Sequence, residues 1–188
     1  MNVAEKRPSD LRQNAVDFER FRLRRFVEAL GEDQLEVRSD DTDLAGIADV
    51  MEGNAKAVLF RAVGPEKAEL VGNVMGGRAR IAAAFGVKPD QLLKEVQRRL
   101  CNKPEIFEVS RAEAPCQQVV LTGKDADVTR LPVHLQHGAD GGPYISATID
   151  YVIDPKTGFT NVGLRRLMLR SERETGIDLV APSDLQAI

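Results

Sequence analysis

Apolar and polar positions along this chain follow a helical period first and a strand period next. From Phe18 to Leu30 the apolar side chains recur at helical spacing, with Asp17 as a cap and Gly31 as a stop, which predicts a helix. "QLEVRS" then alternates like a strand, "TDLAGIADVM" returns to helical spacing behind Thr42 as its cap, and "KAVLFRAV" is a short apolar run. The pattern after the first helix is therefore β-α-β.

A second, less regular unit follows, and the pattern then changes to strands. "ELVGNV" reads as a strand, and "RARIAAAFG" and "PDQLLKEVQRRLCN" read as helices. From Pro104 onward "EIFEVS", "QQVVLTG", "YISATIDYVID" and "FTNVGLRRLML" are all β-like. We expect residues 1–17 to form a flexible tail, 18–110 an N-terminal α/β domain and 111–188 the start of a second domain, with the boundary near 103–116.

The last residues predict a strand and the beginning of a helix. "IDLVAP" is strand-like, and the Pro182-Ser183-Asp184 segment is typical of a helix start, with about one turn of chain after it. An isolated turn is not stable by itself. We therefore expect either a fragment or a domain that another chain completes.

Composition limits the partners that the protein can have. The 188 residues are 43% hydrophobic and 29% charged, which is typical of a globular protein, and the net charge of -3 gives no general attraction to nucleic acid or to an anionic membrane. Neither partner is expected. Cys101 and Cys116 lack a metal-type spacing and are predicted to be small core residues. No apolar leader or membrane-length segment occurs, so we predict a cytoplasmic protein.

Three local motifs each allow a binding role and a structural one. His134 and His137 would share a face of a helix, as a metal site needs, but the flanking Pro132 and Gly138 favour hydrogen-bonded loop histidines. "GADGGPY" could let backbone amides approach an anion, although a turn between strands is favoured. The Gly76-Gly77 pair could expose amides to a phosphate, but packing of the helix start is favoured.

The strand that begins at Phe159 carries polar groups where a sheet would be expected to hold apolar ones. The segment 154–158 predicts a hairpin turn, and the strand after it has two faces: Asn161, Gly163, Arg165 and Leu167 on one, and Thr160, Val162, Leu164 and Arg166 on the other. Exposure to solvent explains one arginine but not both. At least one guanidinium needs an anionic partner, which is either a protein carboxylate in a salt bridge or a ligand phosphate.

Residues 131–170 resemble the UbiD family of reversible decarboxylases, which use prenylated FMN. The shared residues occur in order over some forty positions: Leu131-Pro132, His137, Asp140-Gly141-Gly142, Tyr144-Ile145, Thr160-Asn161 and Arg166. A weaker likeness extends back to Phe18. The resemblance implies an α+β fold in which an N-terminal α/β domain is followed by the first, incomplete part of a split β-barrel that binds the flavin.

The resemblance also implies roles for individual residues. Asn161 would contact a divalent ion, Mn²⁺ or Mg²⁺, that bridges to the cofactor phosphate, and K⁺ is a further candidate ion. Leu164, Arg165 and Arg166 would line the cofactor. Arg166 would also be the catalytic residue that faces the substrate and pairs with a glutamate supplied from elsewhere.

Two features of this sequence complicate that assignment. Asn161 and Arg166 are five positions apart, so a regular strand places them on opposite faces, and they reach one site only if a bulge or the strand end re-aims one of them, which Gly163 would permit. The second metal ligand of the family, often His, falls on Asp184, which could ligate the ion or cap a helix. Ser183 before it is expected to contact the cofactor.

The resulting hypothesis is the N-terminal portion or subunit of a prenylated-FMN-dependent decarboxylase acting on an aromatic or α,β-unsaturated carboxylic acid. The isolated chain is expected to be inactive, and we expect a homo-oligomer or pairing with a chain that carries the C-terminal half. The alternative is a non-catalytic accessory subunit of the same fold that pairs with a catalytic chain. An unrelated flavin-binding barrel is a further option.

Overall fold

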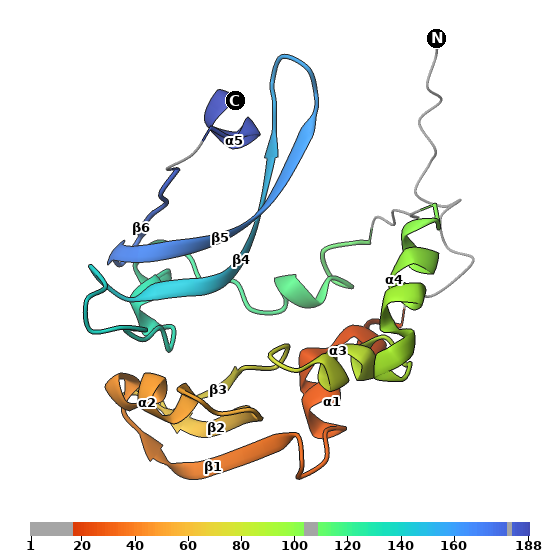
Figure 1. Ribbon diagram of the computed structural model, residues 1–188. Helices are drawn as coiled ribbons and strands as arrows, with labels where there is room; N and C mark the ends of the chain where they lie inside the picture. The colour runs from red at the N-terminus through yellow and green to blue at the C-terminus, as the bar shows by residue number, and fades with distance from the viewer. Residues whose placement is uncertain (1–16, 104–108, 180–181) are drawn as a thin grey trace. The chain divides into compact units, whose positions relative to one another are not determined.

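The computed structural model describes residues 17–103, 109–179 and 182–188 (Figure 1). Within these ranges the chain forms two three-stranded sheets, ordered β1-β2-β3 and β4-β5-β6, together with short helices. The predicted α+β class is confirmed. The helices are α1 (Leu23–Glu28), α2 (Ile47–Met51), α3 (Arg78–Ala84), α4 (Leu92–Leu100) and α5 (Asp184–Ala187).

Two compact units share the chain, and they interleave along it. One comprises Met1–Glu36, Ala55–Val58 and Asn73–Leu121, and the other comprises Val37–Asn54, Leu59–Gly72 and Thr122–Ile188. Their limits follow spatial contacts, not chain order, so the predicted boundary near residues 103–116 stays a prediction.

The first sheet is built around its middle strand. It contains β1 (Leu35–Thr42), β2 (Ala57–Val63) and β3 (Ala68–Gly72), with β2 in the centre. Ala57, Val58, Phe60 and Val63 of β2 are almost completely buried, which explains why this segment reads as a continuous apolar run and not as an alternating one. The strand predicted from "KAVLFRAV" is confirmed.

The N-terminal helix is shorter than the apolar spacing predicts. A 3₁₀ turn at Phe18–Phe21 comes first, Arg22 is extended, and α1 then ends at the cap residue Ala29. Asp17 does act as a cap, but for the 3₁₀ turn, where its Oδ1 accepts a hydrogen bond from the Glu19 amide at 3.1 Å. The apolar spacing is helical on both sides of Arg22, so periodicity alone did not reveal this break.

Capping of the next helical segment also differs from the prediction. Thr42 is the last residue of β1, and Asp43 caps the 3₁₀ turn at Leu44–Gly46 that leads into α2. The Asp43 Oδ1 accepts a hydrogen bond from the Ala45 amide at 2.9 Å. Both residues are common caps, and the strand pairing of Thr42 decides between them.

The start of α3 is held by a buried arginine. Arg80 is only 4% exposed, and its guanidinium donates to the backbone carbonyls of Val74, Ala55 and Asn73 at 2.9–3.0 Å. Gly77 makes room for it, since a Cβ there would lie 3.3 Å from the Arg80 Cζ. The structure therefore favours the packing interpretation of the Gly76-Gly77 pair.

Ion pairs connect neighbouring turns of α4 on its exposed side. In α4 the carboxylate of Glu95 receives hydrogen bonds from Arg98 and Arg99 at 2.8 Å, and these lower the pKa of Glu95 to about 2. The 3₁₀ turn at Pro89–Gln91 precedes α4 and contains the proline at its first position, as expected for a helix start.

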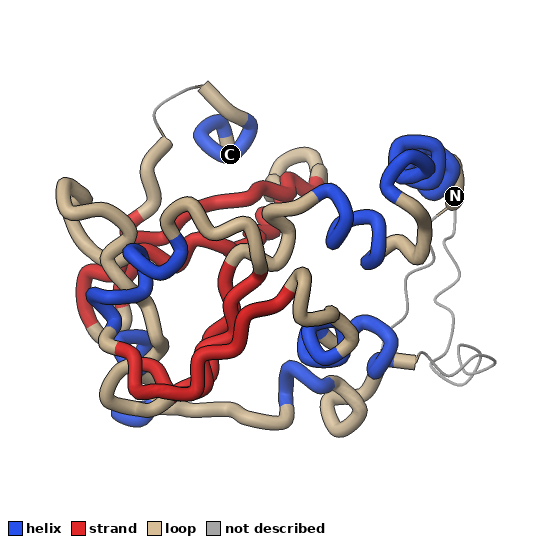
Figure 2. Tube along the Cα trace, turned by 60° about the horizontal axis from the view of Figure 1, so that its bottom comes forward, coloured by secondary structure: helices blue, strands red, loops and turns tan. Residues whose placement is uncertain are grey.

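The second sheet is a long antiparallel hairpin with a short third strand. It contains β4 (Tyr144–Ile153), β5 (Thr160–Ser171) and β6 (Glu174–Gly176), and Figures 1 and 2 show β4 and β5 as a curved pair much longer than any helix. The predicted turn is confirmed: the Asp154 amide donates to Phe159 O at 2.9 Å, and Gly158 takes a positive φ of 72°. Hydrogen bonds, first from the Thr157 hydroxyl and then from the Lys156 amide, lower the pKa of Asp154.

Several strand predictions fail in the second half of the chain. "QQVVLTG" forms no strand: 3₁₀ turns lie at Pro115–Gln117 and Gly123–Asp125, and Val119, Val120 and Leu121 are exposed. The apolar pattern was strand-like, but none of the strands in the described part of the chain pairs with it. Residues 177–179 of "IDLVAP" do not form a strand either. Outside the described residues lie 180–181, most of "EIFEVS" and the predicted tail up to residue 16. A 3₁₀ turn at Val128–Arg130 and the strand β6 were not predicted.

The two cysteines are not core residues. Cys101 and Cys116 are both exposed free thiols. Cys101 follows the last residue of α4, and Cys116 lies in an exposed 3₁₀ turn, so neither position faces a packed core.

We predict that Arg80→Met lowers the free energy of unfolding by about 3 kcal/mol or more, because three backbone carbonyls lose their buried donor. Urea denaturation followed by circular dichroism measures this loss. Arg111→Met, at an exposed position, is the matched control and should change the value by less than about 0.5 kcal/mol. Equal stability of the two variants would show that the Arg80 clamp is not structural.

Candidate functional site

The candidate site is the β4–β5 hairpin, whose two faces differ in burial. Along β5 the half-buried residues are Asn161, Gly163, Arg165 and Leu167, and the exposed ones are Thr160, Val162, Leu164 and Arg166. This is the alternation that the sequence predicts. Directly opposite residues in a ladder share a face, so Thr148, Asp150 and Val152 of β4 join the half-buried set.

A β-bulge lies in this hairpin, but not where the sequence suggested. Gly163 pairs in regular register with Asp150, whereas the register shifts on β4 between Ile145 and Thr148. Two β4 residues there, Ser146 and Ala147, stand opposite the single residue Arg166. The bulge that Gly163 would permit is therefore not formed at that position.

The position of the bulge keeps Asn161 and Arg166 apart. An extra residue in β4 shifts the faces of β4 and leaves the alternation of β5 unchanged. Asn161 is half-buried and Arg166 exposed, on opposite faces of β5. Neither side chain is therefore re-aimed toward the other, and the condition for the two residues to reach one site is not met in this hairpin.

Arg165 forms the salt bridge that the sequence left open. Its Nε donates to Asp150 Oδ1 at 3.2 Å, and both side chains are about one-fifth exposed, at 22% and 23%. Gly163 leaves the space for this contact, because a Cβ there would lie 2.8 Å from Asp150 Oδ1 and 3.0 Å from Arg165 Nε. For Arg165 the interpretation as a structural ion pair is therefore confirmed.

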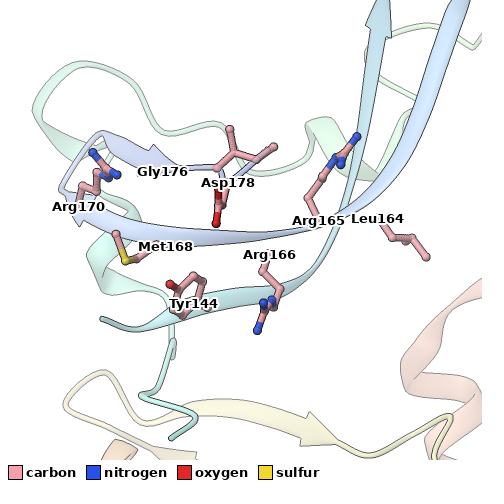
Figure 3. A pocket seen from close by; sticks show the side chains of 9 residues that line it. Tyr144, Leu164, Arg165, Arg166, Met168, Arg170, Gly176 and Asp178 are labelled. Carbon is pink, nitrogen blue, oxygen red and sulfur yellow. The ribbon is translucent and has the colours of Figure 1, made fainter. Parts of the chain in front are cut away.

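Arg166 has different surroundings. Its guanidinium lies on the Tyr144 side of β5, opposite to Arg165 (Figure 3), and its Cζ is 5.6 Å from the Tyr144 ring centroid, a cation–π contact. No carboxylate pairs with Arg166 within residues 17–103, 109–179 and 182–188. Its charge is therefore available to an anionic ligand.

An open cavity of about 400 Å³ adjoins both arginines. Three of the predicted cofactor-lining residues, Leu164, Arg165 and Arg166, border it together (Figure 3). Its remaining lining residues are Tyr144, Met168, Arg170, Gly176, Ile177 and Asp178. Because Arg165 is paired with Asp150, two guanidinium groups, those of Arg166 and Arg170, remain against the one lining carboxylate of Asp178, and the surface is suited to anions.

Asn161 has the donor chemistry for a hard cation. Its Oδ1 is buried and accepts no hydrogen bond in the part of the chain that the structure describes. A buried amide oxygen without a donor is costly, and divalent Mg²⁺ or Mn²⁺ prefers such oxygen ligands. The residue thus fits the predicted metal, although no group of three or more His, Cys, Asp or Glu side chains suited to a metal occurs among the described residues.

Ser183 and Asp184 lie at the start of α5. Ser183 is the cap, with its Oγ 3.4 Å from the donating Gln186 amide, and Asp184 is the first helical residue. The alternative of Asp184 as the cap is therefore wrong, because Ser183 occupies that position. Metal ligation by Asp184 and cofactor contact by Ser183 stay predictions.

The two histidines lie in irregular structure outside the hairpin. The His137 Nδ1 accepts a hydrogen bond from the Ala139 amide at 3.2 Å, and its own amide donates to Asp140 Oδ2 at 3.0 Å, so the loop interpretation of His137 is confirmed. The glycine-rich segment after it is a turn, closed by the Asp140 amide donating to His137 O at 2.9 Å. Burial lowers the pKa of His134 below its ordinary value of 6.5.

Sequence reasoning missed two residues at this site. Asp150 lies on the inward face of "ATIDYV", so its alternation could have indicated a buried carboxylate, but its partner depends on the register. Arg170, in the cavity lining, lies within a second register shift on β5, between Leu169 and Ser171, which no local pattern indicates.

Comparisons with known proteins cover both halves of the chain. Residues 24–100 match the UbiD_N model, the 3-octaprenyl-4-hydroxybenzoate carboxy-lyase N-terminal domain. Residues 107–187 match the UbiD model, the Rift-related domain of the same carboxy-lyase.

Relatives and solved structures agree with these matches. Anhydromevalonate phosphate decarboxylase of Methanothermobacter thermautotrophicus is 22% identical over 159 residues, covering 84% of this chain and 36% of its own. An uncharacterized protein in the cooM 5' region of Rhodospirillum rubrum is 30% identical over 148 residues, covering 76% and 31%. An evolved dimeric form of the UbiD-class enzyme HmfF from Pelotomaculum thermopropionicum, in complex with prFMN, superposes with a TM-score of 0.78 at 27% identity, covering 87% of this chain and 39% of that one.

The chain thus spans about a third of the length of the curated relatives that it matches. Among the described residues, no helix combines the length and apolar character needed to cross a membrane.

We predict that the effect of Gly163→Ala on the free energy of unfolding depends on whether the Asp150–Arg165 ion pair is present. In the wild-type chain the new methyl group displaces the Asp150–Arg165 contact and should lower the free energy of unfolding by about 1 kcal/mol. In an Asp150→Ala background the same change should be neutral or stabilising, because alanine restricts the unfolded chain more than glycine does. Urea denaturation of the four variants measures the coupling, and additive effects would contradict it.

The lowered pKa of His134 predicts a pH dependence of stability. Between the ordinary value of 6.5 and the lower folded-state pKa, the unfolded chain binds more protons, so stability should fall as the pH drops below 6.5. His134→Gln should remove this part of the dependence. Urea denaturation between about pH 7.5 and 5.5 tests it, and identical slopes for the two proteins would refute it.

Proposed function

Because this chain belongs to the UbiD family, we propose that it is the N-terminal portion of a prenylated-FMN-dependent reversible decarboxylase acting on an aromatic or α,β-unsaturated carboxylic acid. The observation that carries the proposal is the arrangement of the hairpin: Leu164, Arg165 and Arg166 border one cavity, and the Asn161 Oδ1 nearby in the same strand is buried without a donor. An anion would suit the arginines at the cavity, and a cation would suit the Asn161 oxygen.

Arg166 is proposed to hold the substrate carboxylate or the carboxylate that acts on it. Its guanidinium is exposed, has no carboxylate partner among the described residues and is oriented by the Tyr144 ring, so it loses little rotational freedom on binding. A cation paired with the substrate carboxylate binds and orients it for reaction, while the negative charge leaves that group as CO₂ departs. When bound, the prenylated flavin supplies the electron sink for loss of CO₂.

Asn161 is proposed to hold a divalent ion, Mn²⁺ or Mg²⁺, that neutralises the cofactor phosphate. K⁺ is a further candidate ion, Ser183 a further cofactor contact, and Asp184 a second metal ligand. One or two protein ligands bind such an ion weakly. We therefore expect the isolated chain to lack activity, since its matches cover only 36% and 31% of two relatives.

The second candidate is a non-catalytic accessory subunit, for which the exposed face of the hairpin offers an interaction surface. Ile149, Tyr151, Ile153, Val162 and Leu164 are all more than half exposed on that face. A cluster of large exposed apolar side chains is typical of an interaction surface. A chain that supplies the remaining UbiD-class portion, or a second copy, could cover it, and both candidates share this expectation.

Co-expression with a prenyl-flavin synthase, alone and with a UbiD-class C-terminal portion, distinguishes the candidates. We predict cofactor absorbance and CO₂ release from a panel of aromatic and α,β-unsaturated acids only in the complemented assembly. Arg166→Ala should lower kcat/KM by about 10²-fold or more, because a preorganised cation at the reacting carboxylate is lost. The matched control, Arg111→Ala, should leave the rate unchanged.

Two results would count against this function. A complemented assembly that binds the flavin but releases no CO₂ from any acid would favour the accessory subunit. Decarboxylation by the isolated chain would contradict the proposal that it is only a portion of the enzyme.

A further inference from the structure

We infer that Asp150 is a second oxygen ligand for the divalent cation assigned to Asn161, on the half-buried face of the hairpin. This inference rests on the proposed function and adds to it a residue outside the family motif.

The register makes Asp150 and Asn161 neighbours on one face of the hairpin. Asp150 pairs with Gly163, and Asn161 lies two positions before Gly163 in the same strand, so Asp150 and Asn161 are diagonal neighbours on one face. Diagonal neighbours in an antiparallel ladder have Cα atoms about 7–8 Å apart. Their side-chain oxygens can therefore flank one ion at metal–oxygen distances of about 2.1 Å.

Neither of the two oxygens accepts a hydrogen bond from the part of the chain that the structure describes. Asp150 Oδ2 and Asn161 Oδ1 are two of only three buried side-chain atoms without a hydrogen-bond partner among the described residues. Each is costly to leave unsatisfied. Since both are acceptors, a hydrogen bond between these two atoms cannot satisfy them, whereas one cation satisfies both.

The other half of the carboxylate is already oriented. Arg165 Nε donates to Asp150 Oδ1 at 3.2 Å, which leaves Oδ2 for a second partner. Carboxylates that bind metals are typically held by such an outer hydrogen bond. The absence of a Cβ at Gly163 leaves the space in which this carboxylate lies.

The charges support a divalent ion with a phosphate. Arg165 and Asp150 together are neutral, so adding a divalent ion gives this face a charge of about +2, which a phosphate dianion offsets. Small divalent ions keep several waters and use few protein carboxylates. Two protein oxygens on one hairpin therefore hold such an ion weakly in the isolated chain, and the phosphate and further ligands would complete the site.

The rival arrangement is a hydrogen bond. Rotation of the Asn161 amide would direct its NH₂ group toward Asp150 Oδ2, because the two ends of the amide have nearly the same shape. In that case Asp150 orients the amide and does not touch the metal.

Mn²⁺ titration of the full 188-residue chain, followed by paramagnetic broadening of backbone amide NMR signals, distinguishes these arrangements. We expect the amides of residues 150 and 161–163 to broaden first. Asp150→Asn should weaken Mn²⁺ binding at least tenfold, whereas Arg165→Gln should keep or strengthen it, because the glutamine NH₂ group can still donate to Asp150 Oδ1 while the competing positive charge is removed. Asp125→Asn, an exposed carboxylate removed elsewhere, is the control and should have no effect.

Only Asp150→Asn is expected to weaken Mn²⁺ binding, whereas Arg165→Gln is not. Misfolding of both variants therefore cannot produce the expected result. Equal weakening in both variants, or unchanged binding in Asp150→Asn with broadening still centred on Asn161, would overturn the role of Asp150 and leave the proposed function intact. No broadening near 150 or 161 in the wild-type chain would also overturn it. Failure of the proposed function is read separately, from cofactor absorbance and CO₂ release.

Discussion

The register of the β4–β5 hairpin is the constraint on which the candidate site depends. The turn that Asp154 and Gly158 form sets this register, so Asp150 stands opposite Gly163 and Thr148 opposite Arg165. A slip of one residue would exchange the two faces of β5. Arg165 would then lose its carboxylate, and Asn161 would move out to solvent.

The same register gives two adjacent arginines different chemistry. Arg165 is mostly buried, where an unpaired guanidinium would be unstable, and Asp150 supplies the opposite charge. Arg166 faces outward and contacts only the Tyr144 ring among the pairings described, so its charge remains for a ligand. One arginine therefore belongs to the structure, and its neighbour can serve recognition.

Each face of the hairpin carries side chains whose preferred partners, a cation on one face and apolar groups on the other, would come from outside the hairpin. The half-buried face has two acceptor oxygens without donors, and the exposed face carries apolar side chains from both strands. A cation satisfies the first, and packing against more protein satisfies the second. Both needs are consistent with a chain that matches about a third of the length of its relatives.

Local signals in the sequence were enough for the α+β class, the hairpin turn, the alternating faces of β5 and the family, which the matches over residues 24–100 and 107–187 confirm. Turn chemistry and period-two alternation depend only on neighbours in the chain, so they can be read without coordinates. The break at Arg22, the bulge opposite Arg166, the partner of Arg165 and the exposed segment at Val119–Leu121 could not. Each of these depends on which distant segment packs or pairs there, and that choice is made by the register and burial of the folded chain.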